Sequence, residues 1–283
     1  MNFSPEQTAF FSRLTSSSSS IQLQAAAGSG KTTTVVAGAD MLPAWQTVMF
    51  LAFNKNIKEE LEARLPKRCS VATFHAAGFR AWQAHTGKRL KPDGDKLAGI
   101  LKDKLKGKDW ELYFAYARRL TSLAKNMGMD TPLMENTFAN WQSLSTHFQI
   151  NLESEDAREE RGIEICQRLL ADSNALCDSV IDFDDMLYAP LRLNIKWPQS
   201  NVIFIDEAQD TNSVQIELLK RMRAANGRVI AVGDPSQAIY GFRGADSDAM
   251  NKMRDAFDME VMPLSVSYRC SKAVVAEAQK FCK

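Results

Sequence analysis

The stretch AAAGSGKTTT, residues 25–34, decides how the rest of this sequence is interpreted. Ile21, Leu23 and Ala25, which lead into the stretch, alternate with polar residues, and this predicts a short strand that runs into a glycine-rich loop. Behind it, the segment Lys31–Met41 has helical character. A strand, a glycine-rich loop and a Lys-Thr pair that opens a helix form a phosphate-binding arrangement, because backbone N–H groups curl around the anion and the helix N-terminus adds partial positive charge. The sequence therefore predicts a nucleotide-binding loop here.

Two side chains of this loop would contact the nucleotide and its metal. Lys31 would reach the β- and γ-phosphates, and the hydroxyl of Thr32 would hold Mg²⁺. The strict pattern G-x-x-x-x-G-K-[ST] has glycine where this chain has Ala25, so the match is a near miss. A flexible Gly-Ser loop in front of a helix is the alternative interpretation. The residues that we expect to cradle the nucleotide are Ala27, Gly28, Ser29, Gly30, Lys31, Thr32 and Thr33.

A second motif supplies the carboxylates that such a site requires. The apolar run NVIFIDE, residues 201–207, predicts a strand that ends in acidic residues. Asp206 would order the Mg²⁺ shell, and Glu207 would polarise the attacking water, as a carboxylate does in in-line phosphoryl transfer. An Asp-Glu pair after a strand could instead cap a helix. Together, the two motifs predict a nucleoside triphosphatase core.

Composition bounds the class of protein. The chain has 283 residues, 45% of them hydrophobic, which is enough for a sizeable core in one large or two modest domains. The formal net charge of +1 neither favours nor excludes a nucleic-acid partner. The five cysteines form no CxxC pair and the histidines number three, so we expect no structural zinc site. No apolar run approaches about 20 residues, so we expect no membrane span. The N-terminus MNFSPEQTAFF has no basic region followed by an apolar run, so we expect no signal peptide, and the scattered cysteines fit a reducing cytoplasm.

Strand and helix patterns alternate along most of the chain. A helix is expected over residues 4–14, with Ser4 as N-cap, Pro5 at the first helical position and Gln7 completing a capping box. The serine tract at residues 15–20 is expected to be a flexible connector. The alternation predicts an α/β fold with a parallel sheet. The other expected strands are residues 48–53, 71–73, 228–234 and 261–265, and the other expected helices are residues 57–65 and 213–224.

Residues 81–179 differ from this pattern. The segments KLAGILKDKL, WELYFAYARRLTSLAK and AREERGIEICQRLLADSNAL have helical spacing and mixed charge, and no strong β run lies among them. We therefore expect a mostly helical insertion within the α/β fold.

Seven blocks, in order, resemble the motifs of the UvrD/Rep-like superfamily I DNA helicases. The first motif of that family tolerates alanine at the leading position, which explains the near miss at Ala25. Any one block is moderately specific, but seven in the right order are very hard to obtain by chance. The blocks are AAAGSGKT (25–32), FLAFNKNIKEEL (50–61), VATFHAAGFR (71–80), DFDDML (182–187), VIFIDEAQDTNSVQ (202–215), VIAVGDPSQAIYGFRGA (229–245) and LSVSYRCS (264–271).

The resemblance implies that the nucleotide is ATP, bound with Mg²⁺, and adds three residues to the site. Gln7 matches a glutamine that reads the adenine base, although a capping box explains it without a ligand, and the two interpretations are compatible. Gln237 matches a γ-phosphate sensor that couples hydrolysis to DNA movement. Arg269 matches an arginine on the γ-phosphate, where a cation stabilises transition-state charge. An ordinary salt bridge is the alternative for Arg269.

For DNA, the resemblance implies a single strand that crosses the top of the sheet. An aromatic residue in IYGFRG would stack on a base, and Phe242 stands where many relatives carry Trp. Phe53 and Phe74 could instead be core residues, because an aromatic next to a buried strand is usually core. The residues that fall in the matching motifs are Phe53, Asn54, Thr73, Phe74, His75, Tyr240, Phe242 and Arg243.

The resemblance also implies a domain organisation and an activity. Residues 1–80 and 180–283 would form a RecA-like ATP-binding domain, and residues 81–179 an inserted helical subdomain whose charges could track a duplex. The matched motifs end at the fourth, so another domain or protein is expected to supply the second RecA-like half. The implied function is a 3′-to-5′ ATP-dependent DNA helicase acting on single strands and single/double-strand junctions. A nucleotide-dependent DNA-binding or regulatory module that does not unwind is the alternative, and a small-molecule kinase explains fewer of the blocks.

Overall fold

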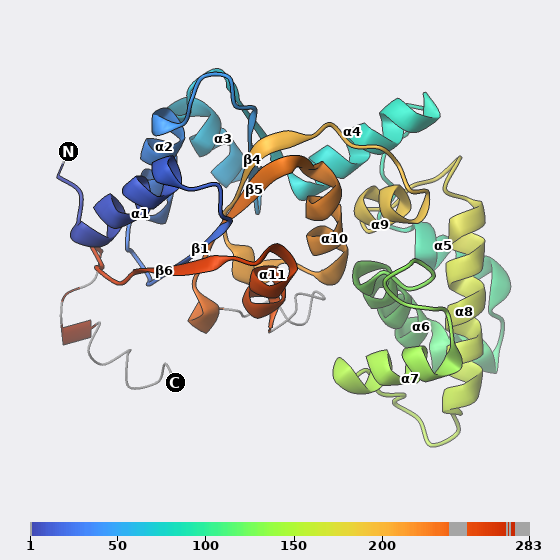
Figure 1. Ribbon diagram of the computed structural model, residues 1–283. Coiled ribbons are helices and arrows are strands. Elements are labelled where there is room, and N and C mark those ends of the chain that lie inside the picture. The colour runs from blue at the N-terminus through green and yellow to red at the C-terminus, as the bar shows by residue number, and fades with distance from the viewer. Residues whose placement is uncertain (1, 238–247, 270, 272, 275–283) are drawn as a thin grey trace.

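The computed structural model describes residues 2–237, 248–269, 271, 273 and 274 (Figure 1). Most sequence-predicted site residues fall within these ranges. Tyr240, Phe242 and Arg243 lie outside the described residues, so their DNA-binding roles stay predictions.

Six parallel strands form one sheet in the order β3-β2-β4-β5-β1-β6. This confirms the expected α/β fold with a parallel sheet. Parallel strands carry all their carboxyl ends to one edge, and ligands of such folds bind beyond that edge. The strands are β1 (Ile21–Ala25), β2 (Val48–Ala52), β3 (Cys69–Thr73), β4 (Ser200–Ile205), β5 (Arg223–Gly233) and β6 (Glu260–Leu264).

Helices cover both faces of this sheet, which is why its central strands are apolar on both sides. In β4, Val202 and Phe204 enter one core and Ile203 and Ile205 enter the other. The first core is closed by α1 (Pro5–Ser16), α2 (Lys31–Met41) and α3 (Lys55–Arg64). The second is closed by α4 (Phe74–Thr86), α9 (Asp185–Arg192), α10 (Ser213–Met222) and α11 (Ala249–Phe257).

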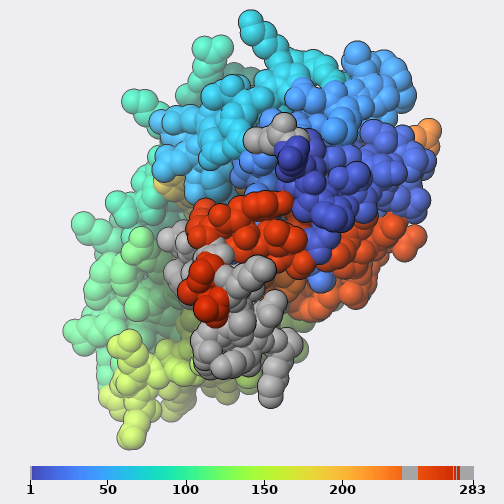
Figure 2. All heavy atoms as spheres, turned by 90° about the vertical axis from the view of Figure 1, so that its left-hand side faces the viewer, coloured from blue at the N-terminus to red at the C-terminus, as the bar shows by residue number. Residues whose placement is uncertain are grey.

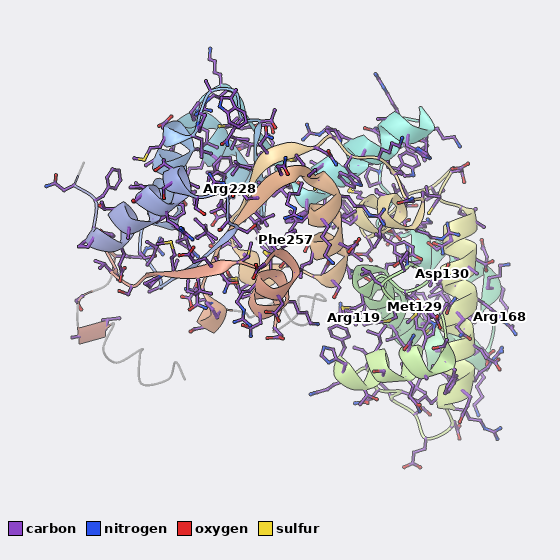
Figure 3. All side chains as sticks on the ribbon, in the orientation of Figure 1. Arg119, Met129, Asp130, Arg168, Arg228 and Phe257 are labelled. Atoms are coloured by element: carbon purple, nitrogen blue, oxygen red, sulfur yellow. The ribbon has the colours of Figure 1, made fainter. Side chains whose placement is uncertain are left out.

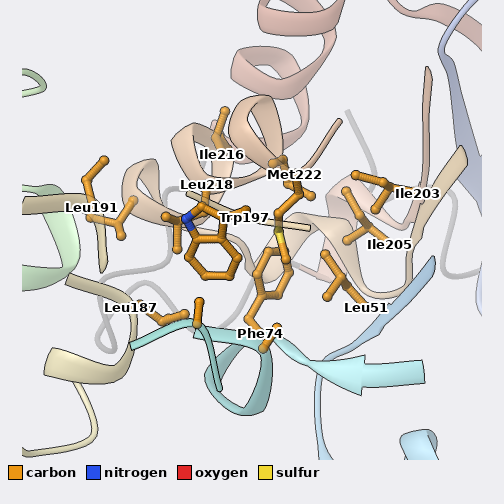
Figure 4. Close-up of a cluster of buried hydrophobic side chains, with 14 of the residues drawn as sticks. Leu51, Phe74, Leu187, Leu191, Trp197, Ile203, Ile205, Ile216, Leu218 and Met222 are labelled. Atoms are coloured by element: carbon orange, nitrogen blue, oxygen red, sulfur yellow. The ribbon is translucent and has the colours of Figure 1, made fainter. Parts of the chain in front are cut away.

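The second core extends beyond the sheet toward α9 and α10. Figure 4 shows Leu51, Ile203 and Ile205 from the strands beside Phe74 and Trp197. Phe74 is 6% exposed and opens α4 directly after β3. This packing fixes the start of α4 at the carboxyl edge of the sheet.

The four remaining α-helices of the described residues gather at one end of the molecule, away from β1 and β6 (Figure 1). They bury a core of their own, in which Leu101, Leu120, Trp141 and Leu169 are at most 3% exposed. They are α5 (Lys96–Lys104), α6 (Lys108–Met127), α7 (Phe138–His147) and α8 (Glu159–Ala175). Helix α4 runs across the expected boundary at residue 80, and the exact domain limits stay a prediction.

Buried charges join this helical insertion to α9. Lys96 Nζ lies 2.6 Å from Asp185 Oδ2, and Lys125 Nζ lies 2.6 Å from Asp182 Oδ2 and 2.7 Å from Asp185 Oδ1. Burial alone lowers the pKa of Lys125, but the two carboxylates outweigh it and raise that pKa above its ordinary value. The four side chains form one closed ionic cluster.

The N-terminal helix packs beside β6, as Figure 2 shows for the blue and red segments. Ser4 and Gln7 form the expected capping box, and Pro5 opens the helix. The serine tract that follows was expected to be a flexible connector. It is anchored instead at its end, because Ser20 is buried and its Oγ accepts a hydrogen bond from Val229 N at 3.1 Å.

No helix among the described residues is both long and apolar enough to cross a membrane.

Candidate nucleotide and strand site

The phosphate loop joins β1 to α2 and has the backbone that an anion site needs. Gly28 and Gly30 have φ angles of +73° and +79°, in the left-handed region that glycine adopts without strain. Gly30 is the N-cap of α2, and no side chain caps the first turn of that helix. The hydroxyl of Ser29 is buried without a hydrogen-bond partner in the described part of the chain. These unsatisfied donors fit a phosphate group.

An ion pair connects this loop to the acidic strand end. Lys31 Nζ lies 2.7 Å from Glu207 Oε2, and both side chains are partly buried. Glu207 has a φ of +51°, a left-handed conformation that costs a non-glycine residue roughly 1–3 kcal/mol. Its carboxylate also accepts a hydrogen bond from Gln209 Nε2 at 2.8 Å. Glu207 makes no side-chain cap to the short helix that follows, so the helix-cap alternative is not supported.

Asp206 lies at the end of β4, beside Glu207. Burial, and after it the charge of Glu207, raise the pKa of Asp206, and Lys31 acts in the opposite direction, so that the pKa is about 6. Asp210 shares these causes, and its pKa is also about 6. Asp206 and Thr32 line one cavity of about 460 Å³ and offer the hard oxygen donors that Mg²⁺ prefers. The cavity is lined by Gly28, Ser29, Gly30, Lys31, Thr32, Thr33, Ile57, Glu60, Arg64, Asp206, Glu207, Tyr268 and Arg269. Of the expected cradle, only Ala27 is missing from this lining.

Gln7 satisfies the capping box and also borders a pocket. Its Oε1 accepts from Ser4 N at 2.9 Å, and its Nε2 donates to Thr34 Oγ1 at 2.8 Å. The hydroxyl of Tyr268 lies 3.4 Å from Gln7 Oε1. These residues adjoin a second cavity, of about 280 Å³, lined by Asn2, Phe3, Gln7, Gly30, Thr33 and Tyr268. Both interpretations of Gln7 remain compatible, and its contact with adenine stays a prediction.

The segment that follows β6 lies against the phosphate loop. Tyr268 N donates to Gly28 O at 2.8 Å, and Ser267 Oγ donates to Ala27 O at 2.8 Å. A Cβ at position 28 would lie 2.5 Å from Arg269 Cβ, so the close approach requires glycine there. No ion pair joins Arg269 to another residue in the described ranges, which removes the salt-bridge alternative within them.

Gln237 is not in contact with these cavities but is connected to Glu207 by hydrogen bonds. Its Nε2 donates to Asp234 Oδ2 at 2.6 Å, and Asp234 N donates to Gln209 Oε1 at 3.1 Å. Gln209 in turn donates to Glu207. Gln209 is buried against Gly233, where a Cβ would meet its Oε1 at 2.5 Å. Gln209 therefore links the expected sensor to the expected base, a role that its position within DEAQD did not reveal.

A third cavity, of about 400 Å³, brings together most of the expected DNA residues that the structure describes. Phe53, Asn54, Phe74 and His75 line it, and each follows the carboxyl end of β2 or β3. Thr73 is not among the residues that line it, and its side chain caps α4 by accepting from Ala76 N. Asn54 likewise caps α3 by accepting from Ile57 N at 2.9 Å.

Asp206 and Glu207 line this third cavity as well as the phosphate-loop cavity. The two carboxylates that follow β4 thus separate the phosphate-loop cavity from the third cavity. Burial lowers the pKa of His75, with Asp184 acting in the opposite direction, so His75 is an uncharged imidazole at neutral pH.

The opposite wall of the third cavity comes from residues outside the nucleotide motifs. Arg119, Ser122 and Asn126 of α6 line it, together with Asp184 before α9. Asp184 lies in the block DFDDML, but the sequence carried no local signal for the residues of α6, because folding the insertion against the sheet brings them to the cavity.

Several known proteins are similar to this chain. The probable DNA helicase II homolog of Mycoplasma genitalium is 25% identical over 90% of this chain and 39% of its own length. DNA helicase II of Escherichia coli is 23% identical over 92% of this chain and 38% of its own length. The ATP-dependent DNA helicase srs2 of Schizosaccharomyces pombe is 38% identical over 35% of this chain and 12% of its own length. The chain thus spans less than two fifths of each of these relatives.

A family model also matches most of the chain, over residues 5–258. The matched region contains the phosphate loop, the acidic end of β4 and the helical insertion. This chain belongs to the family of the UvrD/REP helicase N-terminal domain.

Proposed function

We propose that this chain is the ATP-binding and single-strand-binding half of an ATP-dependent DNA helicase motor. The observation that carries the proposal is the shared wall: Asp206 and Glu207 line both the phosphate-loop cavity and the cavity of Phe53 and His75. A change at the γ-phosphate would therefore act on a bound strand through these two shared residues. The names of the similar helicases support this assignment.

The charges of the phosphate-loop cavity suit a nucleoside triphosphate. Lys31 and Arg269 would neutralise the β- and γ-phosphates, and the backbone of Gly28 and Gly30 would donate N–H groups to them. Thr32 and Asp206 would hold Mg²⁺, which neutralises charge that develops on the phosphate oxygens.

Glu207 would orient the attacking water. In the structure its Oε2 accepts from both Lys31 and Gln209. A phosphate would compete for Lys31 and release one of the two hydrogen bonds on Oε2, which could then accept a proton, while the bond from Gln209 keeps the carboxylate in place. Gln237, at the far end of the same hydrogen-bond chain, would report loss of the γ-phosphate to the strand.

The third cavity would receive a single strand at the carboxyl edge of the sheet. Phe53, Asn54, Phe74 and His75 supply its expected contacts, with Thr73 supporting them as the cap of α4. Phe74 is mainly a core residue, so it would add only a small area to the strand contact. A single/double-strand junction and a partner domain that completes the ATP cleft belong to the same proposal. The second candidate remains a nucleotide-dependent DNA-binding module that does not unwind.

The test is the ATPase rate of the purified chain with and without single-stranded DNA, against Lys31→Ala. We expect slow turnover that DNA increases and that the variant loses, because Lys31 is the loop's direct phosphate contact. Nucleotide binding without any DNA-dependent turnover would favour the second candidate. Turnover that survives in Lys31→Ala would refute the assigned site.

A further inference from the structure

Arg119 is a partly buried cation that has no counter-ion among the residues that the structure describes. It belongs to α6 and lies at the side of the helical insertion that faces the sheet (Figure 3). No hydrogen bond or ion pair joins its guanidinium to another residue within the described ranges. An arginine cannot shed its charge in a protein. A partly buried arginine with no protein partner among the described residues keeps its charge available for an anion.

The neighbouring carboxylate is already committed to other donors. Asp184 lines the same cavity as Arg119. Its Oδ2 accepts from Ser122 Oγ at 2.5 Å, and its Oδ1 accepts from Asn126 Nδ2 at 3.0 Å. The side-chain oxygen of Asn126 accepts in turn from Asn212 Nδ2 at 3.0 Å, at the N-cap of α10.

These bonds fix the face of α6 that carries Arg119. Residues 119, 122 and 126 follow the three- and four-residue spacing of one helix face. Ser122 and Asn126 are hydrogen-bonded to the N-cap residues of α9 and α10, which anchors the helix face that carries Arg119.

The other walls of the cavity indicate which anion fits. Phe53 and His75 stand at the ends of β2 and β3, and Asn54 lies beside them. An aromatic ring and an uncharged imidazole suit nucleobases, whereas a guanidinium suits the phosphodiester backbone. The remaining carboxylates of the lining, Asp206, Glu207 and Asp210, follow β4, so the strand would enter between them and α6.

We propose that Arg119 binds a backbone phosphate of the single strand, so that the helical insertion contributes a direct contact to the strand cavity. This inference rests on the proposed function, since it assigns a further residue to the same strand. Under this inference, the helical insertion contacts the strand directly through Arg119.

The test measures binding of a fluorescent oligothymidylate of about 16 nucleotides to the full chain by anisotropy, from about 50 to about 200 mM salt. The variants are Arg119→Gln, which removes the charge, and Arg119→Lys, which keeps it. The matched control is Arg118→Gln, at the exposed neighbour whose contact is with Asp95 at 3.9 Å. Thermal unfolding by circular dichroism verifies that each variant is folded.

We expect Arg119→Gln to bind about fivefold more weakly near 0.1 M salt and to lower the slope of log Kd against log salt by about 0.7, as one lost phosphate contact on a single strand requires. Arg119→Lys should keep the wild-type slope. Wild-type affinity and slope in Arg119→Gln would overturn the inference and leave the proposed function standing. An equal loss in Arg118→Gln would overturn it too, because the effect would then be general charge. If the wild-type chain does not bind the oligonucleotide, strand binding in this cavity is refuted, and the phosphate contact of Arg119 is refuted as well.

Discussion

Ionisation of the Asp206 carboxylate reduces the stability of the folded chain. Burial and the adjacent Glu207 disfavour its charge, and Lys31 offsets only part of that effect. Its folded pKa of about 6 lies above the ordinary value of 3.8. Between these two values the folded chain binds more protons than the unfolded chain, so its stability falls as the pH rises. Above about pH 6 the loss is complete. A side chain kept for packing alone would not be expected to carry such a cost.

Replacing Asp206 by asparagine should remove this pH dependence. In the absence of nucleotide and metal, Asp206→Asn should match the wild type near pH 4 and become more stable as the pH rises to about 6.5, by roughly 2–3 kcal/mol at about 1.4 kcal/mol per pKa unit. Urea unfolding of both chains across this range measures the difference. Asp178→Asn, at an exposed carboxylate, is the control, with an expected change below about 0.5 kcal/mol. A difference for Asp206→Asn that does not vary with pH would contradict the argument.

At the scale of single residues, the sequence identified those that belong to local motifs. Lys31, Thr32, Asp206 and Glu207 meet in one cavity because the phosphate loop and the acidic pair follow β1 and β4, two strands that the pattern predicted. Their chemical roles remain predictions. Residues whose position depends on a tertiary contact could not be found in this way. Arg119 is the clearest example, because nothing in its local pattern separates it from an exposed arginine.

At the scale of elements, α6 is held to the rest of the molecule by charge as well as by its apolar face. Lys125 is fully buried and contacts both Asp182 and Asp185, which belong to the block DFDDML. The same block supplies Asp184 to the strand cavity. One short segment thus fastens the insertion and forms part of the cavity wall, so displacing α6 should disturb both.

Removing Lys125 should be strongly destabilising. Lys125→Met leaves two buried carboxylates with only Lys96 near Asp185, and breaking a buried pair in this way costs about 3–5 kcal/mol. Lys108→Met, on the same helix, removes an exposed pair with Asp156 and should cost less than about 1 kcal/mol. Urea unfolding measures both at neutral pH. Similar midpoints for the two variants would show that the buried cluster contributes no more than a surface pair.

The strand and helix patterns predicted most element positions within a few residues. β5 is the main exception, since it begins at Arg223 although the apolar run begins only at Arg228. Ser200 pairs with Arg223 and Val202 with Arg228, so β5 carries an irregularity opposite β4. A Cβ at Gly227 would lie 2.8 Å from Ser200 O, which shows how closely the strands approach there. Backbone pairing extends this strand in front of its apolar run, and such pairing leaves no pattern in the sequence that could predict it.

At the scale of the whole molecule, the sheet sets the relation between the sites. The phosphate loop follows β1, the carboxylates follow β4, the strand residues follow β2 and β3, and Arg269 comes after β6. All of these segments meet at one edge because every strand is parallel. The cavity at this edge beside the phosphate loop is lined by the cations Lys31, Arg64 and Arg269. Under the proposed function, a second RecA-like half would close this edge and add further charge.

This arrangement predicts that the chain alone binds ATP without working as a motor. Transition-state charge on the γ-phosphate needs stabilisation from both sides of a cleft, and a single missing arginine can reduce the rate by about 10³–10⁵. We therefore expect nucleotide to raise the melting temperature of the purified chain, with slow turnover and no strand separation of 3′- or 5′-tailed duplexes. Glu207→Gln should keep the nucleotide-dependent stabilisation and lose the residual turnover, because it removes the base and keeps the side-chain volume. Separation of a tailed duplex by the chain alone would show that the edge is closed in another way, for example by a second copy of the chain. Unwinding that appears only above a threshold protein concentration would then show that self-association supplies the other side of the ATP cleft.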